Sequence, residues 1–262
     1  MSQNDFQQEA ELLKLSFQQM YLQKGREQEP HRELHSANLL ESESEWCTRR
    51  YVLMNLYPGE VQKPELKSWD WKREAIFEDG WARHRKIQAL FKKYANVVQD
   101  EKGNLELDLT RLLVDDRLFL SPDAILHFGS EKYLVEIKGL KQEEYVLLTD
   151  DLMQAISVSQ VVAKARIQAN NYLFFTDLQK AIIWIENKNK PQDFKIYVME
   201  RDFDLFKPYE FRVDEINGNT YMVKNHGLKM LSDRVCHSPQ DKLAQNCPMR
   251  DLCFSSKVEE VK

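Results

Sequence analysis

Three charged side chains, Asp123, Glu136 and Lys138, lie in a stretch that otherwise has the pattern of two apolar strands. The stretch SPDAILHFGSEKYLVEIKGLK covers residues 121–141, with GSEK as the loop between the strands. Side chains two positions apart in a strand share a face, so Glu136 and Lys138 point the same way. Carboxylates beside an amine can hold a divalent cation and act on a phosphate ester.

The pairing of the two strands decides whether the carboxylates meet. In the simplest hairpin register Phe128 lies opposite Tyr133, which puts Asp123 opposite Lys138 and diagonal to Glu136. Cβ atoms of such diagonal neighbours are roughly 5–8 Å apart, so both carboxylates can share one cation. A neighbouring lysine can orient a water molecule or neutralise a phosphate. The pattern therefore indicates phosphodiester hydrolysis.

The same residues also have a plainer interpretation. Asp123 follows Pro122 where a strand begins, and Glu136 with Lys138 can form an exposed ion pair on one strand face. Antiparallel strands often present one face to water, so such an acid–base alternation is common. The hairpin by itself leaves both interpretations open.

Helices and further strands must position these residues. The sequence predicts an amphipathic helix over residues 71–95 and a second over about 150–174, which no proline or glycine interrupts. Strands are predicted over residues 180–186 and 194–200, joined by the turn NKNKPQD, with shorter strand pieces over 104–120. The apolar stripe of the first helix consists of Phe77, Trp81, Ile87, Leu90 and Phe91.

This order predicts an α/β fold with one central mixed β-sheet flanked by helices. A helix over residues 4–24 and the polar stretch KGREQEPHRE separate an N-terminal helix and linker, residues 1–33, from a main domain over 34–262. The last fifty residues read as polar and loop-rich. Neither G-x-x-x-x-G-K nor G-x-G-x-x-G occurs, which argues against an ATPase motor or a dinucleotide-binding unit.

Composition favours a folded, soluble, intracellular protein. The 262 residues are 42% hydrophobic and 30% charged, with a net charge of −5. No stretch is apolar enough to span a bilayer, and the N-terminus lacks the apolar region of a secretory signal, so we expect no membrane contact. A net negative charge excludes a uniformly basic surface but is compatible with a local basic groove.

Four cysteines form a second candidate site. They are Cys47, Cys236, Cys247 and Cys253. A reducing compartment favours free or metal-bound thiols over disulfides, and the absence of a C-x-x-C pair argues against a zinc finger. Three of the four fall near the C-terminal end, which favours metal binding. Four thiolates suit either a [4Fe–4S] cluster or a tetrahedral zinc ion.

Several of these stretches together resemble a known superfamily. PDAILHFGSEKYLVEIKG resembles the PD-(D/E)xK signature of restriction-endonuclease-like nucleases, and GWARH, with Gly80 and His84, resembles the G-x-x-x-H helix of the RecB-like members. QANNY, with Gln168 and Tyr172, resembles their Q-x-x-x-Y motif. The resemblance covers about residues 34–254.

The resemblance implies a role for each matching residue. The implied catalytic residues are Asp123, Glu136, Lys138, Gln168 and Tyr172. The implied ligands of a Mn²⁺ or Mg²⁺ ion are His84, Asp123, Glu136 and the backbone carbonyl of Ile137. Apart from the resemblance, the basic runs place Arg49, Arg50, Arg83 and Arg85 where they could contact a DNA backbone beside a metal site, although such a run is usually only a solvated face. The implied fold is a restriction-endonuclease-like sheet.

The cysteine distribution resembles that of iron–sulfur nucleases, which include CRISPR-associated RecB-like exonucleases, the AddB nuclease domain and related phage exonucleases. The segments CTRR and CPMRDLC match their cluster-binding segments, so the resemblance favours a [4Fe–4S] cluster that joins the two ends of the domain. The chain departs from the family in one respect: ten residues lie between Cys236 and Cys247, where the family often has C-x-x-C.

The function implied is a metal-dependent DNA exonuclease that acts on single-stranded DNA or DNA ends. The setting is recombination, repair or CRISPR spacer acquisition, with recombination or CRISPR-adaptation proteins as partners, in the cytoplasm of a prokaryotic or phage-infected cell. The alternative from another class is a non-catalytic module that binds DNA ends or a partner protein and holds zinc on its cysteines.

Overall fold

The computed structural model describes residues 15–16, 18–20, 34–62, 71–105, 111–112 and 117–259. The helix predicted over 4–24 and the linker after it lie mostly outside the described residues, so the division at residue 33 stays a prediction. Of the strand pieces predicted over 104–120, the structure describes β3 (Arg111–Leu112) and β4 (Arg117–Phe119).

A five-stranded sheet forms the centre of the molecule, as the sequence predicted. Its order is β2-β5-β6-β7-β8. The strands are β2 (Asn96–Val97), β5 (Ala124–Phe128), β6 (Glu131–Leu140), β7 (Lys180–Asn187) and β8 (Phe194–Glu200). β6 and β7 are parallel and the other neighbours antiparallel, so the sheet is mixed. A separate small sheet, in the order β1-β4-β3, adds β1 (Leu34–His35).

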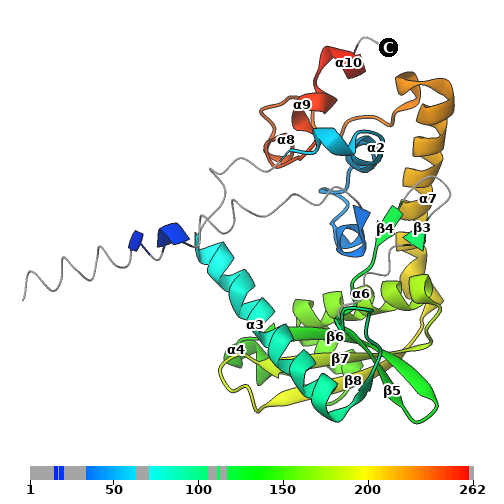
Figure 1. Cartoon of the computed structure of the whole chain (residues 1–262). Helices are drawn as coiled ribbons and strands as arrows, with labels where there is room; N and C mark the ends of the chain where they lie inside the picture. The colour runs from blue at the N-terminus through cyan, green and yellow to red at the C-terminus, as the bar shows by residue number, and fades with distance from the viewer. Residues whose placement is uncertain are drawn as a thin grey trace, which may run out of the picture.

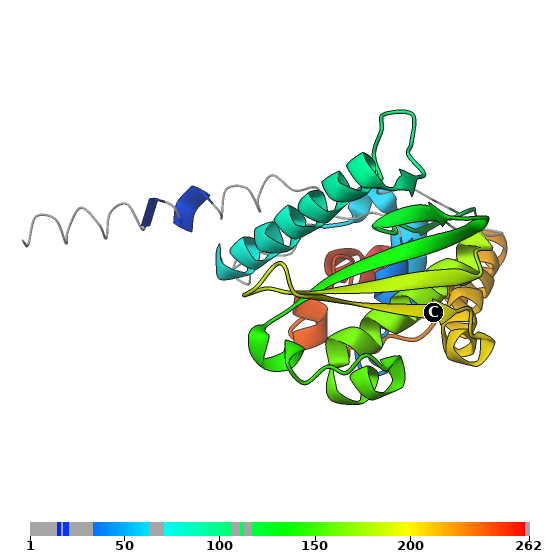
Figure 2. The ribbon, with the colours of Figure 1, turned by 90° about the horizontal axis from the view of Figure 1, so that it is seen from below.

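Helices cover both faces of the sheet (Figure 2). On one face, α3 (Trp71–Tyr94) places Ile87 and Phe91 in one apolar cluster with Val135 and Ile137 of β6. On the other, α6 (Gln160–Thr176) packs in the main core with Leu134 of β6. The alternation of β6 side chains thus divides the strand between two cores.

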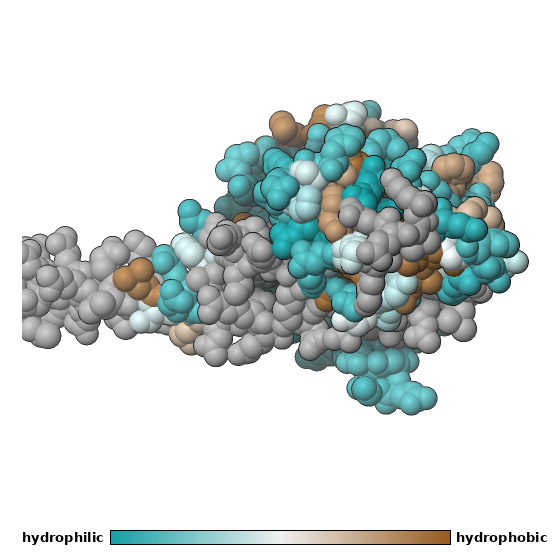
Figure 3. Space-filling model, turned by 90° about the horizontal axis from the view of Figure 1, so that it is seen from above, coloured by the Kyte–Doolittle hydropathy of each residue, from teal (hydrophilic) through white to brown (hydrophobic). Residues whose placement is uncertain are grey.

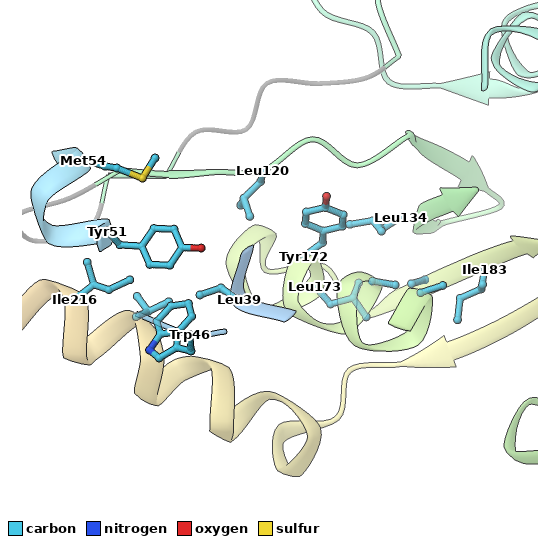
Figure 4. Packing of buried hydrophobic residues seen from close by; sticks show 14 of the residues in the cluster. Leu39, Trp46, Tyr51, Met54, Leu120, Leu134, Tyr172, Leu173, Ile183 and Ile216 are labelled. Atoms are coloured by element: carbon cyan, nitrogen blue, oxygen red, sulfur yellow. The ribbon is translucent and has the colours of Figure 1, made fainter. Parts of the chain in front are cut away.

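The main core continues away from the sheet towards α2 (Thr48–Leu56) and the small helices near the C-terminus (Figure 1). Figure 4 shows Tyr172 beside Leu134 at one end of this core, and Tyr51 with Trp46 at the other. The Trp46 and Tyr51 rings have centroids 4.9 Å apart. The 3-10 helix η1 (Ser36–Leu40) contributes Leu39, which lies between these two ends of the core.

The helix predicted over 150–174 is two helices in the structure. α5 (Leu152–Val158) ends at Ser159, which has extended dihedral angles, φ −135° and ψ 115°. The Ser159 hydroxyl accepts a hydrogen bond from the Val162 amide at 3.4 Å and so caps α6. A serine side chain can satisfy a free helical N–H, so neither proline nor glycine was needed for the break.

The prediction that the last fifty residues are loop-rich is wrong for their first part. α7 (Phe203–His226) is a helix of 24 residues, with Asp202 as the N-cap that accepts from the Leu205 amide at 3.2 Å. Its buried residues Phe206, Val213 and Ile216 recur at helical spacing. Short elements follow it: η4 (Leu228–Met230), α8 (Lys242–Gln245), α9 (Arg250–Cys253) and α10 (Ser256–Glu259).

The stripe predicted for α3 is buried only in part. Ile87 and Phe91 lie in the core, whereas Phe77, Trp81 and Leu90 are 40%, 56% and 48% exposed. Seen from the end that carries the C-terminal helices, hydrophilic residues predominate on the described surface (Figure 3). Among the described residues, no helix is long and apolar enough to cross a membrane.

Candidate active site

The candidate site lies where the sheet loses one strand. β5 pairs with β6 only as far as Val135, whereas β7 pairs with β6 as far as Leu140. Within the described residues, the stretch from Glu136 onward therefore has a neighbouring strand on one side only. A cleft of about 500 Å³ opens there, between α3 and α6. It is lined by Ile76, Phe77, Gly80, Trp81, Arg83, His84, Arg85, Gln88, Ser121, Asp123, Glu136, Ile137, Lys138, Gly139, Gln168, Tyr172 and Lys188.

The hairpin register differs from the predicted one by two residues. Phe128 pairs with Glu131 and Ala124 with Val135, so Asp123 comes next to Glu136 and not opposite Lys138. The loop is shorter than predicted because Gly129 takes a φ of +63°, which a tight two-residue turn requires. A shift of two residues preserves the face of every side chain, so both carboxylates still line the same cleft.

Asp123 is held from three directions. Its Oδ2 accepts a hydrogen bond from the Ile137 amide at 2.6 Å, and its Oδ1 lies 2.7 Å from His84 Nδ1. Its backbone carbonyl accepts from Gln88 Nε2 at 2.8 Å. The carboxylate thus takes the place of a strand partner for Ile137 and fixes the geometry where β5 begins.

Glu136 is the most deeply buried carboxylate lining the cleft, with 1% of its surface exposed. Burial raises the pKa of Glu136 to about 7, although the nearby ammonium group of Lys138 opposes the shift. Glu136 Oε1 forms an ion pair with Lys138 Nζ. Burial lowers the pKa of Lys138, but attraction to Glu136 and Asp123 outweighs it and the net pKa is raised. A carboxyl group that titrates near neutrality is typical of a functional site.

His84 reaches the carboxylates from α3. Burial opposes its protonated form, but the hydrogen bond and the attraction to Asp123 outweigh burial, so the pKa of His84 is raised. With Nδ1 directed at Asp123, the other ring nitrogen remains for a second partner.

Gln168 and Tyr172 support the site from α6. Gln168 Nε2 donates to the Tyr172 hydroxyl at 3.0 Å, and that hydroxyl donates to the Ser121 carbonyl at 3.4 Å. Both side chains line the cleft. Their hydrogen bonds reach the segment that leads into Asp123. The catalytic role expected of both residues stays a prediction.

The four arginines expected to contact DNA lie in different surroundings. Arg85 is exposed and lines the cleft, whereas Arg83 is buried and pairs through Nε with Glu186 at 2.7 Å. Arg49 is buried, lines the cavity of the cysteines and donates to Cys253 Sγ at 3.2 Å. Arg50 pairs with Glu41. DNA contact by these arginines stays a prediction, and Arg85 is the one placed on an open part of the cleft.

Sequence reasoning missed three residues of the site. Gln88 holds the Asp123 carbonyl, and its position four residues after His84 could have indicated the same helix face. Glu186 is buried at the end of β7, where it pairs with Arg83 and Lys86 and ties α3 to the sheet. Lys188, just past β7, lines the cleft, but nothing in its sequence context marked it.

The four cysteines come together at the other end of the molecule. All of them line one small cavity. The ribbon shows α2 near the short helices α8 and α9, the elements that carry or flank these cysteines (Figure 1). The cavity, which other residues also line, is only about 10 Å³. Burial raises the pKa of Cys247 to about 11 and also raises the pKa of Cys236. Over the described part of the chain, no three or more His, Cys, Asp or Glu side chains are arranged to hold a metal ion.

Solved structures that resemble this fold include SSO0001 and the exonuclease LHK-Exo. SSO0001 matches with a TM-score of 0.44 and 14% identity, over 82% of this chain and 88% of that chain. LHK-Exo, an alkaline exonuclease from Laribacter hongkongensis that was also solved in complex with dAMP, matches with a TM-score of 0.41 and 13% identity, over 76% of this chain and 95% of that chain. By sequence, the chain matches no family model and no curated protein. These likenesses concern the fold alone.

Proposed function

We propose that this chain is a divalent-metal-dependent DNA exonuclease that hydrolyses phosphodiester bonds in single-stranded DNA or at DNA ends. The supporting observation is that Asp123, Glu136 and Lys138 line one cleft together with His84. These are the residues that the resemblance to PD-(D/E)xK nucleases assigns to the chemistry. We place the activity in recombination, repair or CRISPR spacer acquisition in a prokaryotic or phage-infected cell, with proteins of those processes as partners.

The donors in the cleft are of the chemical kind that suits a cation with a preference for oxygen ligands, and the described side chains would have to rearrange for three of them to bind it. Mg²⁺ uses one or two carboxylates and completes its shell with water and phosphate oxygens, so Asp123 and Glu136 suffice as charged ligands. These carboxylates contact His84 and Lys138, and a bound cation would take over part of those contacts. We propose His84 and the carbonyl of Ile137 as further ligands, and an imidazole ligand favours Mn²⁺ over Mg²⁺.

The proposed chemistry divides among the residues of the cleft. A bound cation would polarise the phosphodiester and lower the pKa of a water molecule. Lys138 orients that water beside Glu136, and its ammonium group neutralises charge that develops on the phosphate oxygens. Tyr172, through the Ser121 carbonyl, keeps the segment before Asp123 in place. Arg85 lies exposed on the rim, where it can contact a DNA phosphate.

Digestion of end-labelled single-stranded DNA with Mn²⁺ or Mg²⁺ tests this proposal. We expect Asp123→Ala and Lys138→Ala to lower the rate by at least about 10²-fold. The first removes a ligand of the proposed cation, and the second removes an ammonium group that neutralises the developing charge. A chelator should abolish activity in the wild type. Labels at the 5′ or the 3′ end also reveal the polarity of digestion.

Two residues of the same hairpin provide matched controls. Glu131 and Lys132 are exposed and do not line the cleft. Glu131→Gln and Lys132→Ala remove the same kinds of charge and should leave the rate unchanged. If Asp123→Ala and Lys138→Ala digest DNA as fast as these controls, the proposed site is wrong. If no variant and no metal gives digestion while DNA still binds, the chain is the non-catalytic module.

We propose further that the four cysteines hold a [4Fe–4S] cluster with a structural role. Support comes from their placement around one cavity, although they come from segments far apart in the chain. Thiolates are the ligands that such clusters require. Because the cavity is only about 10 Å³, its walls would have to move to admit the cluster. The residues that would hold it are Cys47, Cys236, Cys247 and Cys253.

Anaerobic purification followed by iron, sulfide and zinc analysis tests the cluster. We expect a brown protein with iron and sulfide in equal amounts and loss of both in Cys47→Ser and Cys253→Ser. A colourless protein with one zinc ion per chain would show that the cysteines bind zinc and not an iron–sulfur cluster. If the wild type is purified without any metal and the cysteine variants unfold at the same temperature as the wild type, a structural metal is excluded.

A further inference from the structure

The rim of the cleft carries an apolar patch on α3. Phe77 and Trp81 both line the cleft, and because they are four residues apart they lie on one face of the helix. They are 40% and 56% exposed, although their helical spacing predicted burial. Ile76, which is 62% exposed, extends the patch. Large exposed rings beside a candidate active site mark a surface that meets a ligand.

Positively charged side chains line the same cleft as the two rings. Arg85, one turn beyond Trp81 on α3, and Lys188, just past β7, line the same cleft. Rings that accept a base face, interleaved with cations that accept the backbone, are the pattern of single-strand nucleic acid binding. An apolar protein segment has no anionic group to pair with Arg85 and Lys188, so these charges favour a nucleic acid as the ligand.

The ring spacing favours an unstacked strand over a duplex. Four residues of an α-helix rise by about 6 Å, so Phe77 and Trp81 are separated by about that distance along α3. Bases in a duplex repeat every ~3.4 Å along each strand. One base can therefore stack on each ring only if the strand is extended beyond its duplex form.

We propose that Phe77 and Trp81 form a base-stacking subsite that holds two nucleotides of a single strand next to Asp123 and Glu136. The subsite is sequence-tolerant because every base offers a flat face. Its placement relative to the scissile bond rests on the proposed nuclease function, but the stacking itself does not. The subsite predicts that binding depends on the presence of bases and not only on phosphates.

Fluorescence anisotropy with the full chain carrying Asp123→Asn tests the subsite, since we expect this variant to leave the probe uncut. The probes are a short oligothymidylate and an abasic strand of equal length. We expect Trp81→Ala to weaken oligothymidylate binding about tenfold or more and to leave abasic binding unchanged. Trp81→Phe should restore most of the affinity, because a ring remains.

Tyr94 is the matched control. It is 73% exposed on the same helix but does not line the cleft, so Tyr94→Ala should leave both affinities unchanged. Phe77→Ala should repeat the Trp81→Ala result, and thermal unfolding of each variant checks that the fold is retained.

Two results would overturn the stacking subsite. One is equal binding of the oligothymidylate and the abasic strand by the protein with Trp81 intact. The other is an equal loss for both probes with Trp81→Ala. If the wild type still digests DNA, either result would disprove the stacking subsite and leave the proposed nuclease function unaffected. Base-dependent binding without any digestion by the wild type leaves the subsite standing and sinks the proposed function.

Discussion

Gly139 lies directly against the guanidinium group of Arg83. A Cβ on Gly139 would stand 2.7 Å from Arg83 Nη1 and 2.9 Å from Cζ, closer than real Cβ contacts. Arg83 in turn pairs with Glu186 at 2.7 Å, so it spans from α3 across β6 to β7. The missing side chain at Gly139 therefore lets α3 approach the sheet and sets one wall of the cleft.

Gly139→Ala should destabilise the protein because the new methyl group displaces a buried, ion-paired arginine. We expect a loss of about 1–3 kcal/mol in the free energy of unfolding, the usual cost of overpacking. Urea unfolding measures it. Gly218, in the exposed part of α7, is the control, since no atom lies within 4 Å of its added Cβ. Gly218→Ala should stabilise by about 0.5–1 kcal/mol, because alanine favours a helix. A Gly139→Ala protein as stable as the wild type would show that Arg83 moves freely.

His84→Ala should raise the metal requirement more than it lowers the maximal rate. The imidazole lies 2.7 Å from Asp123, so its loss frees that carboxylate and removes a proposed ligand. We expect the Mn²⁺ concentration for half-maximal activity to rise about 10- to 100-fold, the usual effect of altering such a partner. A lower maximal rate at unchanged Mn²⁺ demand would instead assign His84 to the chemical step.

Mn²⁺ affinity should rise with pH through about 7, because Glu136 must lose its proton to bind a cation. The pKa of Glu136 is raised to about 7, so below that pH the proton competes and affinity falls by up to about tenfold per pH unit. The raised pKa of His84 acts in the same direction. Calorimetry in buffers of different ionisation enthalpy should detect the released protons. Glu131→Gln should keep this pH dependence, and a flat profile in the wild type would mean that Glu136 is already ionised.

Ser159→Ala should weaken the start of α6 without touching the cleft. Ser159 is buried and its hydroxyl caps the helix at the Val162 amide. We expect a loss of about 1 kcal/mol in unfolding free energy with activity unchanged. Ser130→Ala, at the exposed hairpin turn, is the control and should change neither quantity. Unchanged stability in Ser159→Ala would assign the break between α5 and α6 to packing alone.

The hairpin shows why some of the site could be predicted. The register was wrong by two residues, yet Asp123 and Glu136 still line one cleft, because side chains alternate with a period of two. An error of one residue would have moved Asp123 to the other face. The helix spacing of Gln168 and Tyr172 was equally robust, since residues four apart share a face wherever the helix lies.

Other features depend on which part of the fold lies against a side chain, and the spacing of residues in the sequence does not encode this. Phe77 and Trp81 have the spacing of buried residues, but the cleft lies across from them. Arg83 and Arg85 stand in the same basic run, and only the position of Glu186 separates a buried ion pair from an exposed cation. The helix α7 was missed because its apolar residues are spread among polar ones and it contains Pro208 in its early turns.

The two sites differ in how far apart their residues lie along the chain. Asp123 and Ile137, joined by a hydrogen bond, are 14 positions apart, whereas Arg49 and Cys253 are 204 apart. Contacts between residues close in sequence form quickly. Closing a long loop costs more conformational entropy before the contact it brings together can contribute free energy. On the ribosome, the hairpin is complete long before the C-terminal thiols are synthesised. The thiol cavity can therefore close only after Cys253 has been synthesised, and a chain stalled before that point would already contain both acidic residues.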